Sequence, residues 1–287
     1  MSIFSKESKG NEKIRKDLES QLPQRVLDSM AENARKEASQ KLRGRISMIV
    51  SLVVATGIWW LLAEYLLIHV PTPWETAYWS MAFLSDDWYY NSVLASMFRV
   101  YVGFGIGIVA GTFIGIMMGW NLRFRNWSFP AADLLRHVPP VSWVPLTIIV
   151  AGALTPAIVL IIFIGTFFST ALNSMLGVQL IDQSKFRAAK CLGASPVQIF
   201  RHVLLPGALP SVLYGMVLGM GLAWMSVVAG EMISGDYGIG YLAWQSYNLL
   251  RFPEIVLAML TIGGLAYGSS EVVRYIVGKF LKWRDID

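Results

Sequence analysis

Residues able to do catalytic chemistry are few in this sequence. Its one cysteine, Cys191, excludes an intrachain disulfide and a CxxC metal or redox site. Its three histidines, His69, His137 and His202, are too far apart to suggest a local ligand set. There is no GxxxxGK phosphate-binding loop, no HExxH metal motif and no nucleophile elbow. We therefore expect no catalytic residue, no metal site and no cofactor on this chain.

Ionisable residues inside apolar segments are the next candidates, because charges in a bilayer are costly and commonly functional. Glu64 and Arg99 fall near the ends of two such segments, where they could pair with each other or each reach water. Glu231 follows Gly230 and precedes a glycine-rich stretch. It is either a pathway or gate residue or a cap for nearby backbone amides, and the cap is slightly favoured.

The segment RHVPPVSWVPL, residues 136–146, contains three prolines and cannot be a regular helix throughout. At membrane depth, non-helical backbone occurs only where it is buried in protein or lines a water-filled cavity. Trp143 is therefore predicted to line a solute pathway, with interfacial anchoring as the alternative. Met220, Trp224 and Ser226 are added as pathway candidates from proximity alone.

The composition predicts what positions these residues, since 55% of the chain is hydrophobic, 15% is charged and the mean hydropathy is +0.51. About 20 apolar residues cross a bilayer as a helix. The candidate spans are residues 46–69, 94–119, 138–152, 157–175, 210–232 and 255–277. We therefore expect an all-α polytopic membrane protein with six transmembrane helices, whose transmembrane domain covers residues 46–287.

The distribution of Lys and Arg orients these spans. The tail 1–45, the segments 120–140 and 176–209 and the C-terminal stretch together hold 21 Lys and Arg, whereas the alternate loops hold only Arg251. By the positive-inside rule both termini are cytoplasmic, an N-in/C-in arrangement. The net charge of +5 is thus a topological signal, and we expect no nucleic-acid partner.

The two segments outside the spans leave alternatives open. The tail 1–45 shows no cleavable signal peptide, so the first span serves as the targeting signal. Residues 11–43 predict a helix with a break before Pro23, either amphipathic on the inner membrane face or part of a solvated, partly disordered tail. The aromatic outer loop 70–93 favours an interfacial belt over a substrate or partner platform.

A ladder of glycines runs along the second span at intervals of four residues: Gly103, Gly107, Gly111, Gly115 and Gly119. At 3.6 residues per turn they lie on one face, and their missing side chains allow another backbone to approach closely. The ladder predicts helix packing, and a large residue at Gly111 should break assembly.

Residues 187–206, between the fourth and fifth spans, predict two short helices. Gly193 can end the first helix with a left-handed cap. Ser195 can cap the second, with Pro196 as its first residue and Pro206 as its stop. The pair could dock in a partner's groove or pack on its own bundle.

This segment resembles the EAA loop of bacterial ABC importer permeases, which reads Glu-Ala-Ala, three residues, Gly, nine residues, Ile, one residue, Leu-Pro. The matching positions are Ala188, Ala189, Gly193, Leu205 and Pro206, with Val203 at the Ile place and Arg187 in place of Glu. Other stretches between about 90 and 285, such as GTFFSTALNS and AGEMISGDYGIGYL, resemble the nitrate/sulfonate/taurine/bicarbonate-type permeases.

The resemblance implies a permease subunit of an ABC importer in the bacterial cytoplasmic (inner) membrane. It implies a second permease copy, separate ATPase subunits that hold ATP and Mg, an extracytoplasmic solute-binding protein or lipoprotein, and a small anionic solute. The ATPase would contact the cytoplasmic coupling helix between helices 4 and 5, at Arg187, Ala188, Ala189, Gly193, Ala194, Ser195, Pro196, Val197 and Pro206. The alternative, a secondary transporter or channel, should show inverted repeats and paired charges near span midpoints. We find neither in the sequence.

Overall fold

The computed structural model describes residues 24–66, 70–234 and 237–280, and the regular secondary structure of these residues is helical throughout. The chain forms two compact units, residues 1–68 and 69–287. In the first unit α2 (Gln24–Tyr65) continues from the predicted tail into the first span, with Ile46–Tyr65 apolar enough to cross a membrane. The predicted break at Pro23 lies outside the described residues.

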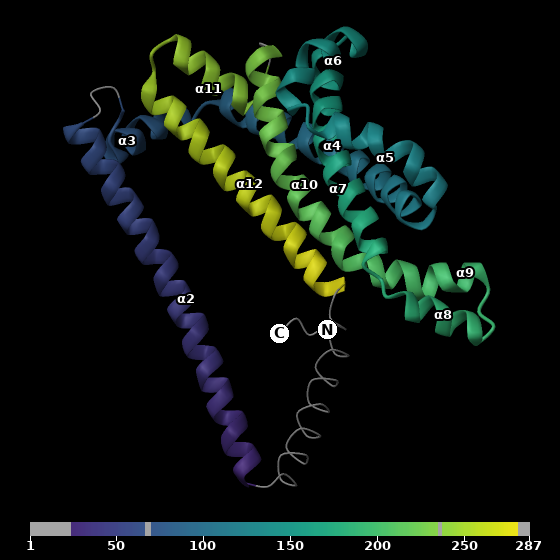
Figure 1. The fold of residues 1–287 in the computed structure, drawn as a ribbon. Helices are drawn as coiled ribbons and strands as arrows, with labels where there is room; N and C mark the ends of the chain where they lie inside the picture. The colour runs from purple at the N-terminus through teal and green to yellow at the C-terminus, as the bar shows by residue number, and fades with distance from the viewer. Residues whose placement is uncertain (1–23, 67–69, 235–236, 281–287) are drawn as a thin grey trace, which may run out of the picture. The chain divides into compact units, whose positions relative to one another are not determined.

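The second unit contains the remaining helices (Figure 1). They are α3 (Pro73–Phe83), α4 (Asp87–Trp120), α5 (Leu122–Arg136), the 3-10 helix η1 (Pro140–Trp143), α6 (Val144–Ala151), α7 (Leu154–Gln179), α8 (Gln183–Cys191), α9 (Pro196–Ile199), the π-helix η2 (Phe200–Leu204), α10 (Leu205–Ser234), α11 (Ile239–Asn248) and α12 (Phe252–Phe280).

The glycine ladder of α4 packs against α7, as predicted. A Cβ atom added at each ladder position would lie only 2.5–3.0 Å from a Cβ atom of α7. The α7 residues, in order along the ladder, are Ile162, Thr166, Thr170, Ser174 and Val178. Each glycine is 59 positions before its partner, so the two helices keep one register and run parallel.

The helix α10 packs on α7 in the opposite direction. Successive close approaches join Gly177 to Ser211, Gly215 to Asn173, and Gly230 to Ile158, so rising numbers on one helix meet falling numbers on the other. Three helices therefore form a tightly packed centre, in which α7 is shared by α4 and α10.

The parallel register of α4 and α7 constrains the chain between them. By that register Leu154 lies level with position 95 of α4, so the chain must return about 36 Å from the end of α4. This return is made by α5 and by η1 with α6, which are bent by 96° relative to each other. The third span predicted at 138–152 is therefore wrong in its bounds, because it covers η1 and α6 and leaves out α5.

Five helices are long and apolar enough to cross a membrane among the described residues, and the bent pair makes up to six. The predicted count of six is reached when the bent pair is one span. The bend follows from Pro139 and Pro140, which lack N–H donors and disfavour a helical residue before them. Accordingly, α5 ends before these prolines, with His137 as its C-cap residue.

The predicted stop at Pro206 is also wrong. The chain passes from α9 through η2 into α10 with no interruption, and Pro206 is the second residue of α10. The N–H of Leu205 bonds to the carbonyl of Phe200, five residues back, in the wider turn of a π-helix. This wider turn accommodates the proline ring, which would otherwise clash with the carbonyl four residues before it.

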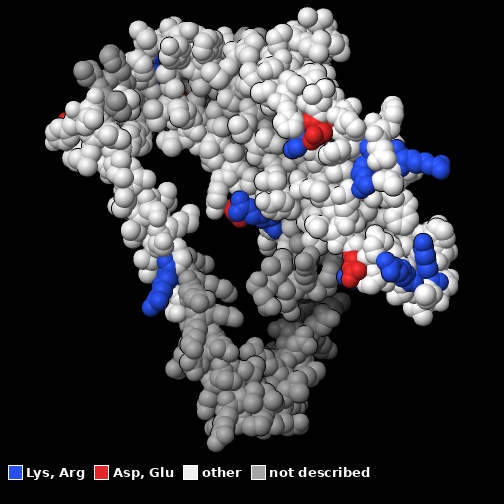
Figure 2. Space-filling model, in the orientation of Figure 1, with Lys and Arg blue, Asp and Glu red and all other residues white. Residues whose placement is uncertain are grey.

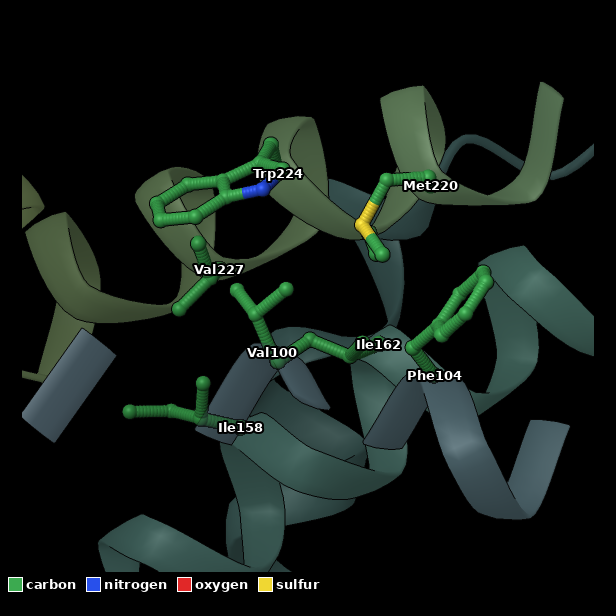
Figure 3. Packing of buried hydrophobic residues seen from close by; sticks show 8 residues of the cluster. Val100, Phe104, Ile158, Ile162, Met220, Trp224 and Val227 are labelled. Atoms are coloured by element: carbon green, nitrogen blue, oxygen red, sulfur yellow. The ribbon is translucent and has the colours of Figure 1, made fainter. Parts of the chain in front are cut away.

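The hydrophobic core of the unit lies where α4, α7 and α10 meet (Figure 3). From α10, Met220, Trp224 and Val227 face two pairs of residues on the other helices. These pairs are Val100 and Phe104 on α4, and Ile158 and Ile162 on α7.

Candidate functional site

The helices α8 and α9 form a hairpin (residues 183–199) that projects from the end of α7 and α10, away from α11 (Figure 1). Its first helix begins at Asp182, whose carboxylate accepts a hydrogen bond from the Ser184 N–H at 2.8 Å. This backbone hydrogen bond, joined by the Ser184 hydroxyl, lowers the pKa of the Asp182 carboxyl. The cap is therefore ionised at neutral pH.

The turn of the hairpin is fixed by Gly193, as predicted. Its φ of +77° is left-handed, and the N–H groups of Gly193 and Ala194 bond to the carbonyls of Lys190 and Ala189, each at 3.0 Å. These two bonds are the Schellman closure of a helix end. A Cβ added at Gly193 would meet nothing within 4 Å, so glycine is needed for backbone conformation and not for space.

The second helix of the hairpin starts at Ser195, also as predicted. The Ser195 hydroxyl accepts from the Gln198 N–H at 3.3 Å, and the Gln198 side chain accepts from the Ser195 N–H at 2.8 Å. With Pro196 as the first helical residue, this is a complete capping box. The hairpin is thus held at both ends of its turn by local hydrogen bonds.

The tip of the hairpin exposes apolar side chains, since Leu192 is 88% and Val197 is 74% exposed. The nine residues predicted to contact an ATPase are all exposed or half-buried. At the base, Ile199 and Leu204 are buried and Trp120 packs against Phe186 and Phe200. The base is therefore attached to the bundle and the tip is left without a partner in the described part of the chain.

Basic residues surround this end of the unit. Figure 2 shows Lys and Arg gathered over α5 and over the hairpin. A cavity of about 600 Å³ at the hairpin's base is lined by Arg125 and Lys190, together with Trp120 and Phe186. The basic residues from which the cytoplasmic side was predicted therefore include those at this end of the unit.

The second candidate, Glu231, lies at the other end of α10 and is fully buried. Its carboxylate accepts hydrogen bonds from Arg99 Nη1 at 2.8 Å, Ser96 Oγ at 2.8 Å and the Gly240 N–H at 3.0 Å. The prediction of a backbone-capping carboxylate is therefore confirmed. Arg99, for which pairing with Glu64 or contact with water were the predicted alternatives, pairs with Glu231.

The Glu231 cluster attaches α11 to α4 and α10. The first N–H groups of α11 are capped from other helices: Ile239 donates to Ser96 Oγ at 2.9 Å, and Gly240 donates to Glu231. Gly238 precedes them with a φ of +140°, and a Cβ there would overlap the Glu231 carboxyl group. Arg99 further donates to Thr155 Oγ1 at 3.2 Å and to the Tyr237 carbonyl.

Sequence reasoning missed Ser96 and Thr155 as members of this cluster. The available signal was Ser96 three residues before Arg99, which places both on one face of a helix. No sequence pattern connects Ser96 or Arg99 to Glu231, because 135 and 132 positions of the chain separate them from it.

The predicted pathway residues lie in different environments. Met220 and Trp224 are 2% exposed and pack in the core described above. Ser226 is buried, and Trp143 is half-buried on η1; the Ser226 hydroxyl and Trp143 Nε1 have no hydrogen-bond partner in the described part of the chain. Their role in a solute pathway stays a prediction.

Comparison with known proteins covers most of the chain, including the hairpin. Residues 103–282 match the family described as the binding-protein-dependent transport system inner membrane component. The chain belongs to this family. Family membership favours the permease subunit of an ABC importer over a carrier or channel that is not coupled to ATP.

Relatives of this transport component agree with that assignment. The nitrate import permease protein NrtB of Leptolyngbya laminosa is 31% identical over 68% of this chain and 70% of its own length. The taurine transport system permease protein TauC of Escherichia coli K12 is 28% identical over 82% of this chain and 88% of its own length. The predicted resemblance to permeases of the nitrate and taurine type is confirmed.

The fold of this inner membrane component is similar to a chain in a crystal structure of the MetNI methionine ABC transporter, described as inward facing. The similarity has a TM-score of 0.50 at 20% identity, over 65% of this chain and 96% of that chain. The predicted helical membrane fold is therefore confirmed, and the protein is an inner membrane permease subunit.

Proposed function

We propose that this permease forms, with a second copy of itself, the membrane pathway of an importer of small anions. ATP and Mg are bound by separate ATPase subunits, and an extracytoplasmic binding protein or lipoprotein delivers the solute. Support for an anionic solute comes from relatives named for nitrate and taurine import. Residues 1–45 form a cytoplasmic tail and 46–287 the transmembrane domain, with both termini inside.

The observation that carries the ATPase contact is the α8–α9 hairpin. It projects from the bundle, its turn is closed by a Schellman motif and a capping box, and its exposed tip is apolar. A rigid element of this kind transmits the movement of a partner to α7 and α10, because it is continuous with both through short connections. A mobile loop could not transmit such movement.

The test is co-purification with the ATPase subunit, comparing Gly193→Asp with Gly193→Asn. Both side chains have similar shape, both tolerate the left-handed conformation, and nothing lies within 4 Å of the new Cβ. We expect the native chain and Gly193→Asn to retain the ATPase, and Gly193→Asp to bind it at least about tenfold more weakly because of the charge at the contact. The proposal fails if the native chain binds no ATPase, or if the two variants bind it equally.

A further inference from the structure

A cavity of about 360 Å³ lies at the bend of the broken span. One wall is the bend itself, and the other walls are α7 and α10. The lining residues are Arg136, His137, Val138 and Pro140 from the bend, Ile164, Gly165, Phe168, Ser169, Leu172, Asn173 and Leu176 from α7, and Leu222 from α10. The cavity thus occupies the one place where the described span backbone is interrupted, which is where membrane proteins commonly line an aqueous space.

The position of the lining residues along α7 places this cavity in the half of the second unit that carries the hairpin. Its α7 lining runs from Ile164 to Leu176, about 18 Å of helix. By the register of α4 and α7, Gly165 lies level with the centre of α4 and Leu176 with its last turn. A solute in this cavity would lie between the middle of the bundle and the proposed cytoplasmic side.

Arg136 is held in place with part of its donor set free. Its Nε donates to Asp133 Oδ1 at 2.7 Å, and within the described chain its Nη groups have no recorded partner. His137 Nδ1 donates to the Asp133 carbonyl at 2.6 Å, which fixes the end of α5 beside it. Asp133 therefore orients the guanidinium through one edge and leaves its forked edge for another acceptor.

Asn173 supplies a second donor from the facing wall. One N–H of its amide donates to the Ser169 carbonyl at 2.8 Å, and an amide nitrogen carries two. Phe168 and Leu172 of α7 and Leu222 of α10 add apolar side chains to the same lining. Among the described lining residues Arg136 carries the only formal charge, and the Asp133 carboxylate paired with its Nε offsets part of that charge from outside the lining. The remaining donors of Arg136 and Asn173, together with the apolar side chains of the lining, fit a small anion with an apolar body.

We propose that this cavity binds a small organic anion on its route through the permease. The Arg136 guanidinium and the Asn173 amide donate hydrogen bonds to a sulfonate or carboxylate head group, and the apolar wall contacts the carbon chain. The inference rests on the proposed import function and names the residues that recognise the cargo. The buried hydroxyl of Ser226 would lie 3.0 Å from a Cβ at Gly165, so Ser226 lies next to one residue of the cavity lining.

The test uses a cysteine as a reporter of charge preference. Ser169→Cys, in a Cys191→Ser background that removes the one native thiol, places a thiol on the cavity wall. In the assembled transporter, its modification rate is measured with an anionic reagent, 2-sulfonatoethyl methanethiosulfonate, and with a cationic one, its trimethylammonium analogue. We expect Arg136→Gln to lower the anion-to-cation rate ratio by about tenfold, because one nearby charge is removed.

Two controls define the outcome. Arg136→Lys keeps the charge and should keep the ratio, and Arg123→Gln removes an exposed charge of α5 that is not part of the cavity lining. The proposal is overturned if Arg136→Gln and Arg123→Gln give the same ratio. It is also overturned if the Ser169→Cys thiol of the assembled transporter reacts with neither reagent, since the cavity is then filled by protein.

Two further measurements separate this inference from the proposed function and from lipid binding. If the permease co-purifies with the ATPase but the cavity shows no preference for the anionic reagent, the anion site is wrong and the proposed function stands. If the cavity shows that preference but the permease binds no ATPase, the proposed function is wrong and the anion site stands. Labelling is also repeated with taurine or nitrate present, in vesicles of phosphatidylcholine with and without phosphatidylglycerol. Protection by taurine supports a site for an organic anion, whereas protection by nitrate but not by taurine contradicts the contact with a carbon chain and overturns the proposal. Protection by phosphatidylglycerol alone assigns the cavity to a lipid head group and also overturns it.

Discussion

Glu231 and Arg99 show how a pair of charges is accommodated inside an apolar bundle. Burying a charge is strongly unfavourable unless it is paired and hydrogen-bonded, and here the carboxylate has a cation, a hydroxyl and a backbone N–H as partners. The same bonds cap the first turn of α11. At the scale of the residue, Glu231 therefore fixes the position of a helix as well as neutralising Arg99.

Glu231→Gln should destabilise the chain by about 3–5 kcal/mol, because it removes the carboxylate of a buried ion pair while keeping the size of the side chain. Thermal unfolding of the purified permease measures the loss. The matched control is Glu271→Gln, which breaks the half-exposed pair with Arg274 and should cost about 0.5 kcal/mol or less. Equal stability of the two variants would contradict a stabilising role for the buried pair.

At the scale of the helix, close packing rests on residues that lack side chains. The glycine ladder of α4 lets α7 pack so closely that a Cβ at a ladder position would overlap it. The contact between α7 and α10 also uses glycines, such as Gly177 and Gly215. Without a hydrophobic effect between helices in lipid, such close contact is what holds spans together. The hydroxyls of α7 that face this contact, at Thr170 and Ser174, are buried.

Gly111→Ala and Gly105→Ala form a matched pair on α4. A Cβ at Gly111 would lie 2.7 Å from the Phe167 carbonyl oxygen and 3.0 Å from Thr170 Cβ, whereas a Cβ at Gly105 meets nothing within 4 Å. We expect Gly111→Ala to cost about 1–3 kcal/mol through overpacking. Gly105→Ala should be neutral or slightly stabilising, because alanine favours the helix. Unfolding midpoints in detergent compare them, and equal midpoints would contradict the packing role of the ladder.

At the scale of the whole molecule, one end of the second unit differs from the other in charge and in structure. The hairpin end carries Arg125 and Lys190 and the other basic side chains of α5 and α8, whereas α11 and its turn lie at the far end of α10 (Figures 1 and 2). The positive-inside rule predicts that the hairpin end is cytoplasmic. The proposed ATPase contact and the proposed anion cavity would then face the same compartment.

The native thiol of Cys191 tests this orientation directly, because it is exposed on the hairpin. A membrane-impermeant maleimide should label it in inverted vesicles and leave it unlabelled in intact cells. Ser85→Cys in a Cys191→Ser background places the thiol in the exposed turn before α4, at the opposite end, and should give the reverse pattern. Labelling of Cys191 from outside would place the termini and the hairpin on the extracytoplasmic side.

Local signals in the sequence were sufficient for the long spans other than the bent pair, and for the two helices and the turn of the hairpin. Hydropathy and length predict the spans because a bilayer imposes one minimum helix length, and Gly193, Ser195 and Pro196 predict the hairpin because caps depend on neighbouring residues only. The packing face formed by the glycine ladder could also be predicted locally, because residues four positions apart lie on one face of a single helix. The local signals left open whether the hairpin docks in a partner or packs on its own bundle, and the family resemblance favoured docking in an ATPase.

What only the tertiary structure decided depends on residues far apart in the chain. The pairing of Arg99 with Glu231 could not be predicted, because the two residues are 132 positions apart in the chain. The burial of Met220 and Trp224 could not be predicted because a helix has several faces, and only the packing of α4 and α7 shows which face of α10 is the core. The bent third span, the passage of the chain through Pro206 and the cavity beside Arg136 likewise follow from how helices pack, since a proline's effect depends on which neighbours accommodate it.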